Sequence, residues 1–189
     1  MTSELFVIVF VNLAFIGLLP FLFFRRDGRF NLRWWLTGLP FFVSAAAVAA
    51  GRYHLVAHWQ GLPDGASDAV AAVLVLASMT MIGWTTGSHR VPLALWHQDN
   101  DAAVQIVNWG PYRYVRHPFY AAFLMTQVAA VLAFPHAVTA LGLAWAIVAL
   151  SLTARREESR LLASALGAEY RSYMTRTGRL VPGVGRLAP

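Results

Sequence analysis

The sequence predicts an all-α, polytopic membrane protein with about five transmembrane helices, folded as a single membrane domain over residues 1–189. Apolar residues make up 58% of the chain and charged residues only 13%, whereas soluble domains carry roughly 25% charged residues. The mean hydropathy is +0.53. Apolar stretches of about 20 residues, the length that a helix needs to cross a bilayer, recur along the chain. The chain has no cysteine, which excludes disulfides, thiolate metal sites and a cysteine nucleophile.

Five apolar stretches are the expected spans, in chain order Glu4–Phe24, Trp34–Ala50, Asp68–Gly87, Pro118–Phe134 and His136–Thr153. Trp34 and Trp35 open the second stretch in the manner of belt residues at a membrane interface. The connection Ser88–Trp109 is too polar to span. The last two stretches are separated by so short a turn at Pro135 that we expect an antiparallel, C-terminal helical hairpin.

A cytoplasmic amphipathic helix is expected after the fifth stretch, over Arg155–Leu166. At about 100° per residue, Glu158 shares a face with the leucines of this segment, whereas Glu157 lies nearer the edge of that face. A carboxylate that faces an apolar core needs a partner. Arg155, three residues back on the same face, is the local candidate for a structural ion pair. The alternative is that Glu158 binds the ammonium group of a ligand.

The arginines predict the orientation in the membrane, and all 15 basic residues are arginines. With five spans, 14 of the 15 fall in the connections after the first and third spans and in the C-terminal tail, which share one side. Positively charged connections face the cytoplasm. We therefore expect an inner-membrane protein with its N-terminus outside and its C-terminus in the cytoplasm. Arginines at helix ends indicate anionic lipid head groups, and not nucleic acid, as the partner.

The histidine spacing predicts no metal site. His54 and His58 are four residues apart, but they fall on the predicted outer side, and we interpret them as interfacial residues. His89, His97 and His136 have no paired spacing with another histidine or an acidic residue that indicates a metal site. The sequence also contains no nucleophile elbow and no phosphate-binding loop.

The segment Gly110–Tyr120, GPYRYVRHPFY, combines two arginines, one histidine and four aromatic residues between two apolar stretches. Pro111 and Pro118 each remove a backbone donor, so a single helix through this segment is not expected. Non-helical backbone at a membrane is tolerated where it is packed in protein or lines a wet cavity. The segment is therefore either a site for a polar ligand or a basic loop that anchors a helix end.

This segment and Arg156–Pro182, REESRLLASALGAEYRSYMTRTGRLVP, together resemble the two-part signature of the isoprenylcysteine carboxyl methyltransferase family and its phospholipid methyltransferase relatives. The order and separation of the two parts also fit that signature. The N-terminal half of the chain resembles the family only in being hydrophobic. The resemblance implies a membrane enzyme that uses S-adenosylmethionine as its cofactor.

The resemblance also implies which residues bind this cofactor. Glu158 occupies the place of the glutamate that binds the amino-acid end of S-adenosylmethionine, with Glu157 as a secondary contact. His117 matches a position that contacts the cofactor, and its alternative is a structural role. The remaining residues placed around the cofactor are Ile106, Val107, Tyr112, Arg116, Pro118, Phe119 and Tyr120. Two of these, Tyr112 and Tyr120, are alternatively belt residues of the membrane interface.

The substrate contacts follow less directly from the resemblance. Ala154 stands where the family has an arginine that contacts the substrate, so this role is expected to shift to Arg155 or Arg156, with Arg113 as a further candidate. Residues 1–87 are expected to shape the acceptor pocket, and residues 88–189 to form the cofactor-binding catalytic half.

The expected function is methyl transfer to a lipophilic or lipidated acceptor, most like carboxyl O-methylation of an isoprenylcysteine. Aligning acceptor, methyl group and sulfur is sufficient for such a displacement, so we expect His117 and Glu158 to act by positioning. N-methylation of a phospholipid or another lipophilic amine is the alternative enzymatic function. A non-enzymatic membrane scaffold is the third hypothesis.

Overall fold

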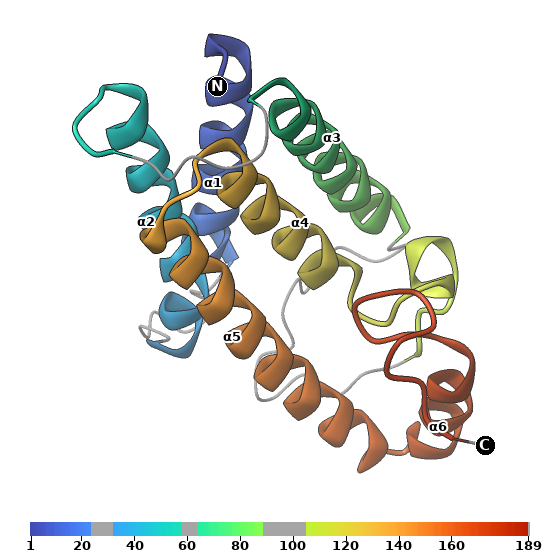
Figure 1. Ribbon diagram of the computed structural model, residues 1–189. Helices are drawn as coiled ribbons and strands as arrows, with labels where there is room; N and C mark the ends of the chain where they lie inside the picture. The colour runs from blue at the N-terminus through green and yellow to red at the C-terminus, as the bar shows by residue number, and fades with distance from the viewer. Residues whose placement is uncertain (24–31, 58–63, 89–104, 189) are drawn as a thin grey trace. The chain divides into compact units, whose positions relative to one another are not determined.

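The computed structural model describes residues 1–23, 32–57, 64–88 and 105–188. Within these ranges the chain forms six α-helices and a short 3₁₀ helix, and no β-strand, which confirms the all-α class (Figure 1). The elements are α1 (Ser3–Phe23), α2 (Leu32–Arg52), α3 (Asp64–Ser88), η1 (Gly110–Arg113), α4 (Pro118–Ala133), α5 (Ala137–Leu162) and α6 (Gly167–Arg176).

The five apolar stretches correspond to helices α1 to α5, apart from Phe24, which lies outside the described residues. Within the described residues, two segments are long and apolar enough to cross a membrane, Gly65–Ser88 in α3 and Ala137–Leu162, which is the whole of α5. The apolar segment Ser3–Leu19 and helix α4 are shorter. The count of five spans therefore stays a prediction.

The end of the fifth stretch differs from the expectation. The sequence predicts a span that ends at Thr153 and an amphipathic helix over Arg155–Leu166, whereas the structure has one continuous helix, α5, which ends at Leu162. The residues around this junction are mostly good helix formers, and no proline or glycine interrupts them. Beyond α5 the chain turns sharply at Gly167, where a Cβ would lie 2.3 Å from the carbonyl oxygen of Leu162.

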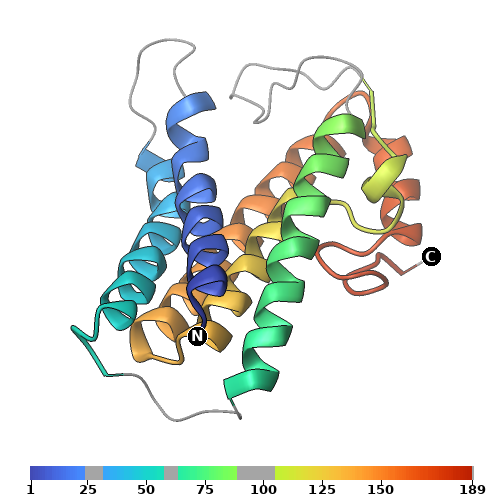
Figure 2. The same cartoon turned by 90° about the horizontal axis from the view of Figure 1, so that it is seen from above.

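The described chain divides into two compact units. The first contains Met1–Met79 and Ala122–Ala149, and the second contains Thr80–Ala121 and Leu150–Pro189. Helices α1 and α2 of the first unit lie side by side, as Figures 1 and 2 show. The buried side of α1 includes Leu5, Val9 and Leu13, at the spacing of one helical face, while Val7 and Val11 are exposed.

Buried polar side chains connect the helices of the first unit. The amide of Asn12 in α1 donates to the Thr126 hydroxyl in α4 at 2.9 Å, and the Ser78 hydroxyl in α3 lies 2.8 Å from the same oxygen. The Ser44 hydroxyl in α2 donates to Gln127 in α4 at 2.9 Å. Such groups cost free energy when they are buried without partners. Their pairing therefore specifies which helix faces meet.

A proline inside α2 has a distant compensating partner. Pro40 has no N–H, so the carbonyl of Leu36, four residues earlier, loses its helical hydrogen bond. The indole N–H of Trp145 in α5 donates to that carbonyl at 3.0 Å. The carbonyl that Pro40 leaves without a donor in α2 is thus satisfied by a side chain of α5.

Helix α2 ends in a Schellman motif centred on His54, whose φ is +58°. The amide of Leu55 donates to Ala50 at 2.8 Å, and the amide of His54 donates to Gly51 at 3.1 Å. His54 is exposed and serves as the left-handed residue that ends the helix. Its expected interfacial partner, His58, lies outside the described residues.

Replacing His54 by glycine should stabilise the protein, because a left-handed φ costs an L-residue roughly 1–2 kcal/mol that glycine avoids. We expect the midpoint of thermal unfolding in detergent to rise. His54→Ala is the matched control and should not raise it. A glycine variant that is less stable than wild type would contradict this assignment of the helix end.

Replacing Thr126 by valine should lower the free energy of unfolding by about 1–3 kcal/mol, because it leaves buried Asn12 and Ser78 without their shared partner. Thr86→Val is the matched control, since Thr86 is exposed and its hydroxyl bonds only the carbonyl of Ile82, at 2.9 Å. Urea unfolding of the two variants measures the difference. Equal midpoints would show that the buried bonds do not stabilise the first unit.

Candidate functional site

The predicted site segment lies in the second unit and is not a single helix, as its two prolines predict. Gly110 has a φ of +59° and opens η1, and Pro118 opens α4 as its first residue, a position that suits proline. The indole of Trp109 donates to the carbonyl of Ser88 at 2.7 Å, which joins the start of the segment to the C-terminal end of α3.

The C-terminal segment pairs with this stretch through its backbone. Val115 and Gly178 form an isolated parallel β-bridge. The amide of Arg116 donates to Gly178 at 2.8 Å, and the amide of His117 donates to Arg179 at 3.1 Å. A Cβ at Gly178 would lie only 2.0 Å from the carbonyl oxygen of Val181, so the turn that follows requires glycine at this position.

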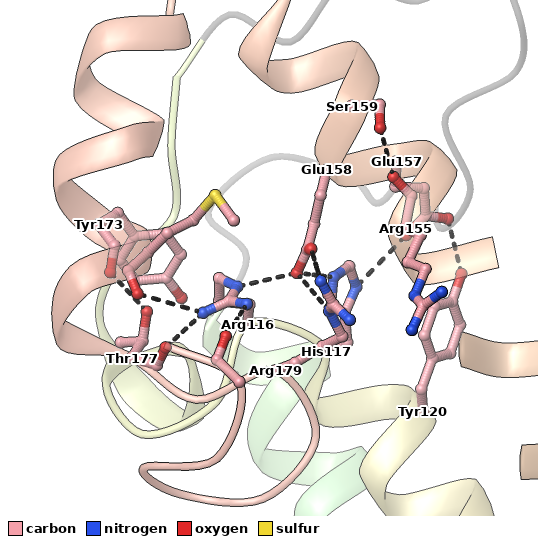
Figure 3. Close-up of polar contacts among 12 residues, drawn as sticks. Arg116, His117, Tyr120, Arg155, Glu157, Glu158, Ser159, Tyr173, Thr177 and Arg179 are labelled. Carbon is pink, nitrogen blue, oxygen red and sulfur yellow. Dashed lines mark hydrogen bonds and ion pairs between the residues drawn. The ribbon is translucent and has the colours of Figure 1, made fainter. Parts of the chain in front are cut away.

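Arg116 is a buried cation whose guanidinium is occupied by protein groups. Its residue is 4% exposed. Nε donates to Glu158 Oε1 at 2.9 Å, and Nη2 donates to the carbonyl of Gly185 at 2.8 Å. Nη1 donates to the carbonyls of Met174 and Thr177. Arg116 therefore holds the C-terminal segment against Glu158 (Figure 3).

Glu158 is 3% exposed and is neutralised by two guanidinium groups. Besides Arg116, Arg179 donates to both of its carboxylate oxygens, with Nη2 2.6 Å from Oε2. The local candidate from the sequence, Arg155, is not one of these two partners, and its side chain is exposed. Helical spacing indicates only local neighbours, whereas a buried carboxylate takes its partners from the chain that packs over it.

His117 lies between two carboxylates. Its Nδ1 is 3.4 Å from Glu157 Oε2, and its Nε2 is 3.3 Å from Glu158 Oε1. Its ring stacks on that of Tyr120, with centroids 5.4 Å apart. Burial opposes a charge on the imidazole, but the hydrogen bonds and charges of Glu157 and Glu158 outweigh it and raise the pKa of His117. The site therefore favours an imidazolium ion.

Glu157 is the more accessible carboxylate of the pair. Its side chain is 25% exposed, compared with 4% for Glu158. The hydroxyl of Tyr120 donates to Glu157 Oε1 at 2.6 Å. The two adjacent glutamates of α5 thus differ in environment. Glu158 points toward Arg116 and Arg179, whereas Glu157 points toward Tyr120 (Figure 3).

The remaining predicted residues divide into buried and exposed groups. Ile106 packs in an apolar cluster with Tyr170, Tyr173 and Met174. The carbonyl of Tyr112 accepts a 2.5 Å hydrogen bond from the Tyr173 hydroxyl. Pro118 is buried, and Val107 and Phe119 are half-buried. The candidate substrate residues Arg113, Arg155 and Arg156 have exposed side chains, outside the hydrogen-bonded cluster described above.

Five of the residues predicted from the sequence lie together in one cluster, namely Arg116, His117, Tyr120, Glu157 and Glu158 (Figure 3). Arg179 also belongs to this cluster but was not predicted. That residue lies within the second quoted motif, but nothing in its spacing from Glu158 predicts a contact. Among the described residues, no group of three or more histidine, cysteine or acidic side chains could hold a metal ion.

The raised pKa of His117 predicts a pH dependence of stability. A histidine whose pKa is raised by folding stabilises the protein fully below its unfolded value of about 6.5, and this contribution is lost as the pH rises through the raised pKa. We expect wild type to be more stable than His117→Gln at pH 6, with a difference that shrinks toward pH 9. Thermal unfolding across this range measures it.

Thr86→Val provides the control for that experiment. Neither threonine nor valine titrates between pH 6 and pH 9, so its difference from wild type should not change with pH. A difference between wild type and His117→Gln that stays constant or grows with pH would contradict the imidazolium assignment.

The family model of the isoprenylcysteine carboxyl methyltransferase (ICMT) family matches residues 69–164 of the chain. This range is just over half of the sequence and contains His117, Glu157 and Glu158. Comparisons with curated proteins and with solved structures gave no match. The chain therefore belongs to the isoprenylcysteine carboxyl methyltransferase family of membrane methyltransferases.

Proposed function

We propose that the protein is an integral membrane methyltransferase that uses S-adenosylmethionine and acts on a lipophilic acceptor, most like an isoprenylcysteine carboxyl O-methyltransferase. Membership of the family supports the reaction class. The observation that carries the proposal is the position of His117, within 3.4 Å of both Glu157 and Glu158. Two motif segments far apart in the sequence thereby form one charged cluster.

The different exposures of Glu157 and Glu158 suggest different roles for the two carboxylates. The charge of Glu158 is balanced by Arg116 and Arg179, so little of it remains for a ligand. Glu157 is more accessible, and a carboxylate is a suitable partner for the ammonium group at the amino-acid end of S-adenosylmethionine. Within the proposal, Glu157 takes the principal cofactor contact that the resemblance implied for Glu158, and Glu158 orients His117.

The remaining cofactor contacts stay as the sequence predicted them. Tyr112 and Tyr120 offer aromatic faces, which attract a sulfonium cation. Ile106, Val107, Pro118 and Phe119 are apolar groups for the nucleoside portion. Arg113, Arg155 and Arg156 are exposed, which leaves them accessible to an anionic acceptor.

The cofactor, when bound, supplies an electrophilic methyl group on a sulfonium. The protein contributes alignment of the acceptor and exclusion of water. A carboxylate or thiolate acceptor attacks as an anion and needs no general base. An amine acceptor must first lose its proton. Glu157 and Glu158 raise the pKa of His117, so the imidazole retains its own proton more strongly and is a poorer acceptor for that of an amine, which favours an anionic acceptor.

The topology is part of the same proposal. It has five spans in the inner membrane, with the N-terminus outside and the C-terminus in the cytoplasm, and the arginine distribution supports this orientation. Helices α4 and α5 form the C-terminal hairpin, as the short turn at Pro135 predicts. Residues 1–87 would then shape the acceptor pocket, residues 88–189 would form the catalytic half, and anionic lipids would surround the cytoplasmic ends. A scaffold that retains the motif only as architecture would not bind the cofactor.

Calorimetric titration of the purified, full-length protein with S-adenosylhomocysteine tests the proposal. We expect Glu157→Gln to weaken binding at least tenfold, since a hydrogen bond to a charged group contributes about 1.5–3 kcal/mol. Glu169→Gln, on an exposed residue in the first turn of α6, is the matched control and should bind like wild type. Wild type that binds no S-adenosylhomocysteine would contradict the proposal.

The product of methyl transfer separates the acceptor classes. Incubation with methyl-labelled cofactor, a prenylated cysteine and mixed phospholipids should give label that mild base releases as methanol, because a carboxyl methyl ester hydrolyses. Label that is stable to base and remains on a phospholipid amine would instead establish N-methylation.

A further inference from the structure

Arg179 holds Glu158 through a forked contact. Its Nε lies 3.1 Å from Oε1 and 3.0 Å from Oε2, and its Nη2 lies 2.6 Å from Oε2. The side chain of Arg179 is 27% exposed, and that of Glu158 is 4% exposed. A planar guanidinium that bonds both oxygens fixes the orientation of a carboxylate as well as its charge.

The backbone around Arg179 is held in place on several sides. We call residues Thr177–Leu187 the C-terminal strap. The amide of Arg179 donates to Val184 at 2.8 Å within the strap, and the amide of Leu187 donates to Met174 at 3.1 Å. The carbonyl of Arg179 accepts from the amide of His117 at 3.1 Å. The strap therefore presents Arg179 at one position beside the site.

The two oxygens of Glu158 have different partners. Oε1 receives Arg116 Nε at 2.9 Å and Arg179 Nε at 3.1 Å, and it lies 3.3 Å from His117 Nε2. Both hydrogen bonds to Oε2 come from Arg179. Without Arg179, the buried Oε2 of Glu158 would lose both donors, and the carboxylate could rotate about its Cγ–Cδ bond. The contact between Glu158 and His117 would then no longer have a fixed geometry.

We propose that Arg179 is a positioning residue of the methyl-transfer site, which acts by fixing the Glu158 carboxylate against His117. The inference rests on the proposed function and extends the site beyond the matched range 69–164 to the C-terminal strap. Arg179 acts through Glu158 and makes no contact with the cofactor of its own in this proposal.

Lysine distinguishes positioning from charge balance. Arg179→Lys keeps the positive charge but replaces the planar fork by a single ammonium group. If Arg179 only neutralised Glu158, the lysine variant would behave like wild type. Positioning predicts that lysine restores only part of the function that Arg179→Gln removes.

The experiment is calorimetric titration of full-length protein in detergent with S-adenosylhomocysteine. We expect Arg179→Gln to weaken binding at least tenfold and Arg179→Lys to weaken it by an intermediate factor. Arg176→Gln is the matched control, because Arg176 is exposed on α6 and lies three residues earlier; it should bind within twofold of wild type. Thermal unfolding of each variant identifies the folded fraction to which the affinity refers.

A double-mutant cycle tests the route through Glu158. In a Glu158→Gln background, Arg179→Gln should add less than a twofold loss, because the carboxylate that it positions is already gone. A merely structural role would instead lower stability and leave the affinity of the folded protein unchanged. If Arg179→Gln does not fold, Arg179→Lys provides the same comparison in both backgrounds.

The outcomes separate this inference from the proposed function. Wild type that does not bind S-adenosylhomocysteine overturns both. Wild type that binds, with Arg179→Gln or Arg179→Lys within twofold of it, overturns the positioning role alone. Losses from Arg179 and Glu158 that multiply in the double variant also overturn it.

Discussion

The buried charge of Glu158 is the constraint on which the second unit depends. A carboxylate removed from water is strongly destabilising unless it is paired and hydrogen-bonded. Here the partners come from both sides in sequence, with Arg116 before α4 and Arg179 after α6. The chain beyond α6 must therefore fold back along the segment that contains Arg116. The carbonyls of Gly178 and Arg179 accept hydrogen bonds from the amides of Arg116 and His117 there.

The same physical rule shapes the first unit, with neutral groups instead of charges. Asn12, Ser78 and Thr126 satisfy one another between three helices. Trp145 supplies the donor that Pro40 withholds from Leu36. Apolar side chains alone would pack in many registers, whereas each buried polar pair is satisfied in only one arrangement. Polar pairing thus specifies the packing in both units.

Two neighbouring glutamates have acquired different properties through tertiary contacts. Glu158 is enclosed by guanidinium groups, whereas Glu157 keeps a quarter of its side chain exposed and bonds the hydroxyl of Tyr120. His117 lies within 3.4 Å of both carboxylates, which raise the pKa of its imidazole. Groups of one residue type can take different roles when their environments differ, and in this protein a single residue step along α5 produces that difference.

The sequence alone determined the all-α class, the approximate positions of five helices and the two segments that form the candidate site. It could do so because hydropathy, helix propensity, proline and the ICMT-like motifs are all local properties of the chain. It did not reveal that α5 runs through to Leu162, because a membrane boundary is not a helix end. Nor could it identify Arg179 as the partner of Glu158 in place of Arg155. That choice depends on how the chain returns after α6, and only the tertiary structure decides that Arg116 and Arg179, of the 15 arginines, reach the buried carboxylate.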